Sequence, residues 1–365
     1  MADRTRTRVT LEPTSGDSPG TWNAYQRYYV MGLRALPDVR FNHGALVDQV
    51  LDGIRERGWR GAHFGWNIAA KLNRDQRSEN ATHVGRYTFQ FPNRGMIKVA
   101  IDAHDGRDIR DPLAYDWSDL YFKTSRWPSL SYGSKVRPLI CGNGALDNAR
   151  ISRLVEMRNR ERDLDLVLIA KLWPSKPASP TYWNPVEHLV RVFETLAALK
   201  LRTHLCALIP PLTTGDSFPR HFIKRLENAR VSVKRDVTAE ELWNATATSR
   251  LAFVRPGKHL CVSWRMIDHL AMGACTVCDR AAYPEWPVPL RAGHELIDCG
   301  CGIGEDESLP DEAEYSRIAE TVMQLLADPE RAEQCRRDAA DYFDRYVTPS
   351  QIARYLLEVS QKSLL

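Results

Sequence analysis

The stretch Ser263-Trp264-Arg265-Met266-Ile267-Asp268-His269-Leu270-Ala271-Met272-Gly273, followed by Ala274-Cys275-Thr276-Val277-Cys278-Asp279, decides how the second half of the chain folds. Trp264, Ile267, Leu270 and Ala271 recur at the spacing of one helix face. Gly273 stands where a helix C-terminus commonly needs a left-handed residue. The short apolar run from Cys275 to Cys278 is typical of a buried strand, so the stretch predicts a helix, a tight turn and a strand.

The residues before this helix predict a binding site for a phosphate group. Arg250–Arg255 reads as a strand, and Pro256-Gly257-Lys258 is the loop that leads into the helix. A glycine loop exposes backbone N–H groups, and the N-terminus of a helix attracts an anion. Arg255, Lys258 and Arg265 would add cationic side chains to this site.

The length of the chain and the order of its elements predict two α/β domains. A chain of 365 residues is longer than a single hydrophobic core usually grows. Strands alternate with helices along the second half, which predicts a doubly wound parallel sheet, and the strand-loop-helix opening of the first half predicts another Rossmann-like domain. We place the domains at residues 1–155, together with a final helix at 349–365, and at residues 156–348.

Composition and charge indicate a globular protein with an anionic ligand. Hydrophobic residues make up 43% and charged residues 26% of the chain, and the formal net charge is +4. This mild excess suits an anionic ligand but is far from the charge of a nucleic-acid coat. The sequence shows no apolar run of membrane-spanning length and no apolar N-terminal leader, so we expect a cytoplasmic protein.

The eight cysteines leave two interpretations open. Cys275 and Cys278, followed by Cys299 and Cys301, have a spacing that resembles a four-thiolate zinc site. Residues three apart on a strand point to opposite faces, however, which argues against a shared ligand for the first two. We therefore favour buried thiols in a reducing compartment and no bound metal.

Three side chains in the first half are candidates for a general base. Met96–Ile101 is a strong strand that runs directly into Asp102, His104 and Asp105. Ligands of open α/β sheets lie beyond the carboxyl ends of the strands, and a histidine beside a carboxylate can act as a base near neutral pH. The alternative is that the two aspartates only cap the following turn. Lys123, at the end of another strand, could bind an anionic acceptor or hold Asp102.

The segment Gly58–Arg94 is rich in arginine, asparagine, histidine and aromatic residues without a clear period. It fits a loop region shaped for an acceptor, or equally an irregular edge with packed aromatics. Basic residues interleaved with aromatics at Arg55–Arg94 and Lys123–Trp127 leave room for DNA, where cations meet phosphates and rings stack on bases. The modest net charge argues against DNA.

The pattern Ser263-x-Arg265-x-x-Asp268-x-Leu270-Ala271-x-Gly273-Ala274-x-x-Val277 resembles the donor segment of nucleotide-sugar glycosyltransferases with the two-domain GT-B fold, especially exostosin-like and group 1 members. The resemblance implies that the helix faces the donor diphosphate and that Asp268 touches the donor sugar or ribose. It also implies a last helix that returns to the first domain. Group 1 enzymes usually carry a glutamate eight residues before Asp268, where this chain has Leu260.

The same resemblance extends to the segment Ile169–Lys176, where Lys171 stands in for the arginine of the family. The donor-binding residues predicted in this way are Lys171, Lys176, Arg255, Lys258, Ser263, Arg265 and Asp268. GT-B enzymes generally neutralise the leaving diphosphate with cationic side chains and a helix N-terminus. The resemblance therefore implies a nucleotide-sugar co-substrate, with a UDP-sugar favoured, and no metal or other cofactor.

The function that these features favour is transfer of a sugar, of the hexosyl type, from a nucleoside-diphosphate sugar to an acceptor bound by the first domain. The acceptor could be a saccharide, a small molecule or a nucleobase in DNA. A nucleotide-sugar epimerase or hydrolase of the same fold remains an alternative, as does a binding subunit without catalytic activity. Whether the transfer inverts or retains the anomeric configuration stays open, because only inversion needs a strong base in the first domain.

Overall fold

The structure is a computed structural model that describes residues 5–12, 19–43, 83–175, 179–211, 217–257, 260–280 and 284–365. The chain divides into two compact units. Unit 1 comprises Met1–Asn148, Pro284–Pro289 and Arg345–Leu365, and unit 2 comprises Ala149–Tyr283 and Leu290–Asp344. The division thus falls a few residues before each predicted boundary, and the short segment Pro284–Pro289 belongs to unit 1.

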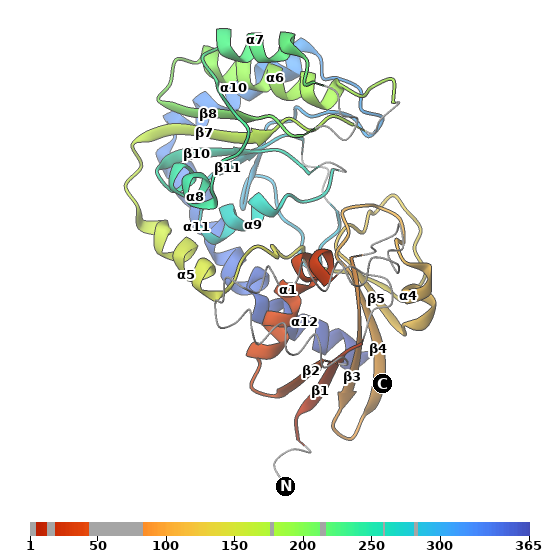
Figure 1. The fold of residues 1–365 in the computed structure, drawn as a ribbon. Coiled ribbons are helices and arrows are strands. Elements are labelled where there is room, and N and C mark those ends of the chain that lie inside the picture. Colours follow the sequence, from red (N-terminus) through yellow and green to blue (C-terminus); the bar gives the residue numbers. More distant parts are fainter. Residues whose placement is uncertain are drawn as a thin grey trace. The chain divides into compact units, whose positions relative to one another are not determined.

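Unit 1 contains a six-stranded sheet with the order β2-β1-β3-β4-β5-β6 (Figure 1). Its strands are β1 (Thr7–Leu11), β2 (Val39–His43), β3 (Val84–Phe91), β4 (Gly95–Asp102), β5 (Leu120–Lys123) and β6 (Val136–Pro138). Its helices are α1 (Pro19–Ala35), α4 (Pro112–Trp117) and α12 (Pro349–Lys362), the last preceded by the π-helical turn η4 (Phe343–Val347). The prediction of an α/β domain in the first half is confirmed.

Strand β3 corrects the predicted loop at Gly58–Arg94. It pairs antiparallel with both β1 and β4, and the hairpin to β4 turns through Asn93 and Gly95, whose φ angles are 59° and 102°. Tyr87 and Phe89 alternate toward the core and are fully buried. The aromatics of β3 are therefore packed core residues, which agrees with the alternative of packed aromatics, and residues 55–82 lie outside the described residues.

Helix α12 packs against α1 within unit 1, which confirms the prediction that the last helix returns to the first domain (Figure 1). The Tyr28 hydroxyl donates to the Val347 carbonyl at 3.0 Å, and the Tyr355 hydroxyl donates to the Pro138 carbonyl at 2.9 Å. Gly32 permits the close approach of the two helices, because a Cβ atom there would collide with the Pro349 carbonyl.

We expect Gly32→Ala to lower the free energy of unfolding, measured by urea denaturation. In an open helix this substitution would stabilise by about 0.5–1 kcal/mol. Overpacking against backbone costs about 1–3 kcal/mol and should outweigh that gain. Ala35→Ser, which adds one atom at an exposed position of the same helix, is the control. A more stable Gly32→Ala variant would show that the helices do not meet at this glycine.

Unit 2 contains a fully parallel six-stranded sheet with the order β12-β11-β10-β7-β8-β9. Its strands are β7 (Leu164–Lys171), β8 (Thr203–Leu208), β9 (Ser232–Lys234), β10 (Ser249–Val254), β11 (Thr276–Cys278) and β12 (Ile297–Asp298). Its helices are α6 (Asn184–Ala198), α7 (Arg220–Asn228), α8 (Ala239–Ala247), α9 (Trp264–Ala271), α10 (Glu312–Ala327) and α11 (Pro329–Tyr342), and α5 (Asn148–Glu156) with the 3-10 turn η3 (Met157–Asn159) leads into the unit. The predicted doubly wound sheet is confirmed.

Both faces of this sheet are covered, as the continuous apolar runs of its strands require. On β7, Leu166 and Leu168 pack into the core formed with α6 and α10, whereas Val167 and Ile169 point to the opposite face. There they meet Ala245 of α8. In Figure 1, α6, α7 and α10 lie on one side of the sheet and α8 and α9 on the other.

The stretch that decides the fold adopts the predicted helix, turn and strand. The Ser263 side chain caps α9 by accepting the backbone N–H of Arg265 at 3.3 Å. Gly273 follows the helix with a φ of 55°, in the left-handed region predicted for it. Strand β11 then begins at Thr276.

The eight cysteines are buried. The Cys299 thiol donates to the Cys278 carbonyl at 3.0 Å. A hydrogen bond with Cys335, together with burial, holds the pKa of the Cys275 thiol well above its ordinary value. In the described part of the chain, no group of three or more His, Cys, Asp or Glu side chains is arranged to hold a metal ion. The described residues also contain no helix with the length and apolarity that crossing a membrane requires.

Candidate functional site

The topology of unit 2 places a ligand crevice at the carboxyl ends of β7 and β10. From β7 the chain proceeds outward to β8 and β9, and then returns to form β10 on the other side of β7. Ligands of open α/β sheets bind at such a switch point. In the parallel pairing Ala252 lies opposite Val167, so the same register places Arg255 beside the end of β7, next to Lys171.

Lys171 and Arg255 are half-buried at this edge of the sheet. The Lys171 ammonium lies 5.5 Å from the centre of the Trp173 ring. The Arg255 Nε donates to the Pro256 carbonyl at 3.2 Å, while its Nη1 is buried without a hydrogen-bond partner. Among the described residues, neither cation has a carboxylate within ion-pair distance, so both can accept a negatively charged ligand.

Arg265, in the first turn of α9, adds a third cation. Burial lowers the pKa of its guanidinium; nearby Asp268 raises it, and Arg255 lowers it further. Arg255 disfavours the charge of Arg265 less than Asp268 favours it, and Asp279 raises the pKa of Arg255 against the effect of burial. Neither guanidinium forms an ion pair with a described carboxylate, so a bound anion would stabilise both charged forms against burial.

Two other residues of the predicted donor set serve the structure itself. The hydroxyl oxygen of Ser263 caps α9. Asp268 is 5% exposed, and its Oδ2 accepts a hydrogen bond from the indole Nε1 of Trp243 on α8 at 3.0 Å. This carboxylate links α9 to α8, and the predicted contact of Asp268 with a sugar or ribose hydroxyl stays a prediction. Lys176 and Lys258 lie outside the described residues.

Sequence reasoning missed Asp279, which follows β11 at the same edge of the sheet. Asp279 is 3% exposed, its Oδ2 lies 3.1 Å from the Nε2 of His188, and the Nδ1 of His188 lies 3.0 Å from the Tyr315 hydroxyl. Its Oδ1 is buried without a hydrogen-bond partner among the described residues, and Asp279 and Arg255 both line a cavity of about 20 Å³. The signal in the sequence was its position, directly after a buried strand.

In unit 1 the predicted base Asp102 is fully occupied by protein partners. Its Oδ2 accepts from the Tyr121 hydroxyl and from the Lys123 ammonium, each at 2.9 Å, and its Oδ1 accepts from the His104 backbone N–H at 3.0 Å. Both Asp102 and Lys123 are 0% exposed. The structure therefore corrects the prediction that Asp102 is a free base. Of the two roles predicted for Lys123, the structure shows the contact with Asp102, and the ammonium is buried away from an acceptor.

The geometry of His104 also differs from that of a general base. Its Nδ1 accepts the backbone N–H of Gly106 at 2.8 Å, so the neutral ring carries its proton on Nε2. Burial lowers the pKa of His104 to about 4, although Asp102 opposes this shift. The ring also stacks on His83, with 5.4 Å between ring centres. His104 is thus a neutral hydrogen-bond donor, and Asp105, half-buried beside it, stays a predicted base.

The basic and aromatic residues considered for DNA binding, at Arg55–Arg94 and Lys123–Trp127, do not form an exposed binding face in the part of the chain that the structure describes. Lys123 is buried against Asp102, and Trp127 is buried under the guanidinium of Arg107, 4.0 Å from its ring centre. Tyr87 and Phe89 belong to the core of the sheet. Rings in these positions cannot stack on nucleic-acid bases.

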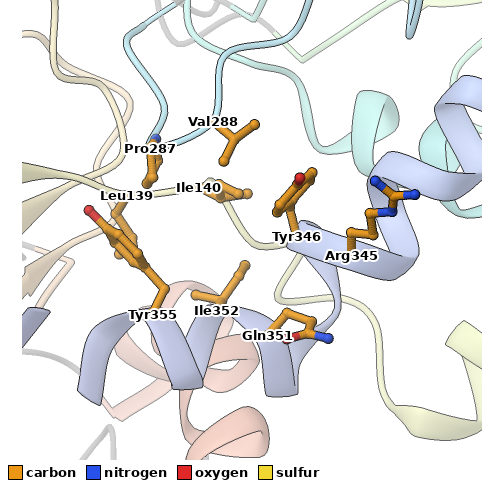
Figure 2. Close-up of a pocket in the computed structure, with 9 residues that line it drawn as sticks. All are labelled: Leu139, Ile140, Pro287, Val288, Arg345, Tyr346, Gln351, Ile352 and Tyr355. Atoms are coloured by element: carbon orange, nitrogen blue, oxygen red, sulfur yellow. The ribbon is translucent and has the colours of Figure 1, made fainter. Parts of the chain in front are cut away.

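A second cavity, of about 60 Å³, lies within unit 1 (Figure 2). Figure 2 shows Ile352 and Tyr355 pointing from α12 toward Leu139 and Ile140. The Tyr355 hydroxyl is already bonded to the Pro138 carbonyl. The cavity is a packing gap between α12 and the loop after β6, without the convergent polar groups of a binding site.

Among the comparisons with known proteins, only the search of solved structures found matches. No family model matches the sequence, and a search of curated proteins found no match. Anabaena HepE, solved with UDP and glucose, is 11% identical over 96% of this chain and 98% of its own, with a TM-score of 0.46. A glycosyltransferase from Rickettsia africae is 12% identical over 98% and 97%, with a TM-score of 0.42. A proposed UDP-N-acetylglucosamine 2-epimerase from Listeria monocytogenes is 12% identical over 96% and 95%, with a TM-score of 0.43.

The sequence identities and TM-scores of these structures are too low to indicate an activity. The two α/β units follow from the observed strand order and pairing, and the chemistry that they support follows from the side chains described above.

We expect Lys123→Met and Asp102→Asn each to destabilise unit 1 by about 3–5 kcal/mol, because each leaves one partner of a buried ion pair uncompensated. The double variant should lose less than the sum of the two, as a double-mutant cycle by urea denaturation would measure. Lys362→Met, which removes the exposed pair with Glu358, is the control and should change stability little. Additive losses would mean that the buried pair does not form.

We expect NMR of 15N-labelled histidine to show His104 protonated on Nε2 and unprotonated on Nδ1 at pH 7, with a titration midpoint near pH 4. Because the folded pKa lies below that of the unfolded chain, this group contributes stability above about pH 6.5 that is lost as the pH falls toward 4. A midpoint near 6.5 would instead restore His104 as a candidate base.

Proposed function

We propose that the chain is a glycosyltransferase of the two-domain GT-B class, which transfers a sugar from a nucleoside-diphosphate sugar to a saccharide or small-molecule acceptor. Unit 2 would bind the donor. The observation that supports this most strongly is the gathering of Lys171, Arg255 and Arg265 at the switch point of a parallel sheet, none of them in an ion pair with a described carboxylate.

A diphosphate fits these groups better than a single carboxylate would. It offers several anionic oxygens to Lys171, Arg255 and Arg265, and the N-terminus of α9 adds a favourable dipole. The same cations would stabilise the charge that develops on the leaving diphosphate, in place of a metal ion. We therefore propose that the donor site needs no metal.

Unit 1 would supply the acceptor side of the reaction. In this proposal the Nε2–H of neutral His104 donates a hydrogen bond to a substrate oxygen, and the buried pair of Asp102 and Lys123 keeps its backbone in position. With a pKa of about 4, His104 is too weak a base to take a proton from a hydroxyl group near neutral pH.

A thermal-shift screen with UDP, GDP, ADP and dTDP tests donor binding, since a ligand of the native state raises its melting temperature. We expect Arg265→Ala to weaken the selected nucleotide about 10–100-fold by calorimetry, as expected for loss of a charge-assisted hydrogen bond of about 1.5–3 kcal/mol. Arg202→Ala, on the amino side of the same sheet, should leave Kd unchanged. An unchanged Kd in Arg265→Ala would remove this residue from the site.

Turnover separates the transferase from the two alternatives. A transferase consumes the nucleotide sugar only when an acceptor is present. Release or interconversion of the sugar from donor alone would identify a hydrolase or an epimerase. Tight donor binding with no turnover across a panel of saccharide and small-molecule acceptors would indicate a binding subunit.

A further inference from the structure

Arg255 and Asp279 line the same cavity in unit 2, and each carries a buried polar atom without a hydrogen-bond partner among the described residues. These atoms are Nη1 of Arg255, a donor, and Oδ1 of Asp279, an acceptor. Buried polar groups are nearly always hydrogen-bonded, so two unpartnered atoms around one cavity indicate a ligand that completes them. The cavity belongs to the same edge of the sheet as the proposed donor site.

The two side chains attract each other but do not form an ion pair. Asp279 raises the pKa of Arg255 against the effect of burial, yet the closest approach of their charged atoms exceeds 4.0 Å. A gap of this kind between an arginine and a carboxylate leaves room for one bridging group.

A chain of hydrogen bonds through His188 and Tyr315 holds Asp279 in place. With its proton on Nε2, His188 donates to Oδ2 of Asp279 and accepts the Tyr315 hydroxyl proton on Nδ1. His188 is fully buried between these two partners. The Asp279 carboxylate is therefore held in a fixed orientation beside the cavity that it lines, as a preorganised ligand contact requires.

The size and polarity of the cavity select a hydroxyl group. A volume of about 20 Å³ holds one water-sized group. A phosphate oxygen only accepts and would be repelled by Asp279, whereas an ammonium group only donates and would be repelled by Arg255. A hydroxyl group donates and accepts at once. Leu260, on the same cavity wall, offers an apolar side chain and does not compete for it.

We propose that Asp279 and Arg255 together bind one hydroxyl group of the donor sugar, and that Asp279 determines which sugar the site takes. This inference rests on the proposed function, because it places the sugar next to the diphosphate. Arg255 then contacts both parts of the donor, whereas Asp279 contacts the sugar alone.

Calorimetry with UDP and with UDP-glucose, UDP-galactose and UDP-N-acetylglucosamine tests the assignment; if the thermal-shift screen selects another base, the same sugars are used on it. In the wild type, the best sugar should tighten binding relative to the free diphosphate. In Asp279→Asn that gain should fall about fivefold or more, with Kd for the diphosphate unchanged. Asp298→Asn, on neighbouring β12 and bonded to the Gly300 N–H at 2.7 Å, is the control and should behave as wild type.

A series of monodeoxy sugars on the same nucleotide tests the wild-type protein directly, so the result does not depend on the folding of a variant. One deoxy donor should bind about tenfold more weakly than its parent, and this loss should be clearly smaller in Asp279→Asn, where Arg255 alone keeps its contact with the hydroxyl group. Equal binding of every deoxy donor, equal weakening of diphosphate and sugar nucleotide in Asp279→Asn, or no gain from any sugar would overturn this inference alone. Failure of every nucleotide to bind would instead overturn the proposed function.

Discussion

The half-buried guanidinium groups of Arg255 and Arg265 carry positive charge at the carboxyl edge of the second sheet without an ion pair to a described carboxylate, and the proposed chemistry depends on this arrangement. Burial disfavours a charge that no opposite charge compensates, because the low dielectric of a protein interior replaces the water around it. The parallel sheet places them there: one follows β10 directly, and the other begins the helix that the same strand feeds. An anionic ligand would supply the compensating negative charge.

Two buried aspartates show how the same residue type serves structure in one unit and binding in the other. Asp102 accepts three hydrogen bonds through both oxygens, from Tyr121, Lys123 and the backbone of His104, and is 0% exposed, so a ligand does not reach it. Asp279 is held through one oxygen by His188 and keeps the other unpaired. The number of satisfied oxygens separates the two roles, since an unpaired buried acceptor is costly unless a ligand completes it.

The sequence pattern predicted unit 2 almost element by element. Strong periodicity and local signals, such as the left-handed glycine at Gly273, are short-range properties that a chain carries in its residue order. The sequence analysis did not predict strand β3, although Tyr87, Phe89 and Phe91 stand at every second position, which is the spacing of one strand face. Strand β3 lies antiparallel between β1 and β4, and this pairing depends on residues far apart in the sequence. The segment is also rich in arginine and asparagine, so the alternation of aromatic residues did not suffice to predict the strand.

The sequence by itself determined that this protein has two α/β units and that Arg255 and Arg265 lie at the carboxyl edge of the second sheet. Both follow from periodicity and chain order, whereas the return of the last helix to the first unit was implied by the family resemblance. Only the tertiary structure decided that Asp268 bonds to Trp243 and that Asp279 lines a cavity. Partners such as these are 25 and more residues apart, and burial, which sets whether a carboxylate serves the fold or a ligand, depends on what packs around it.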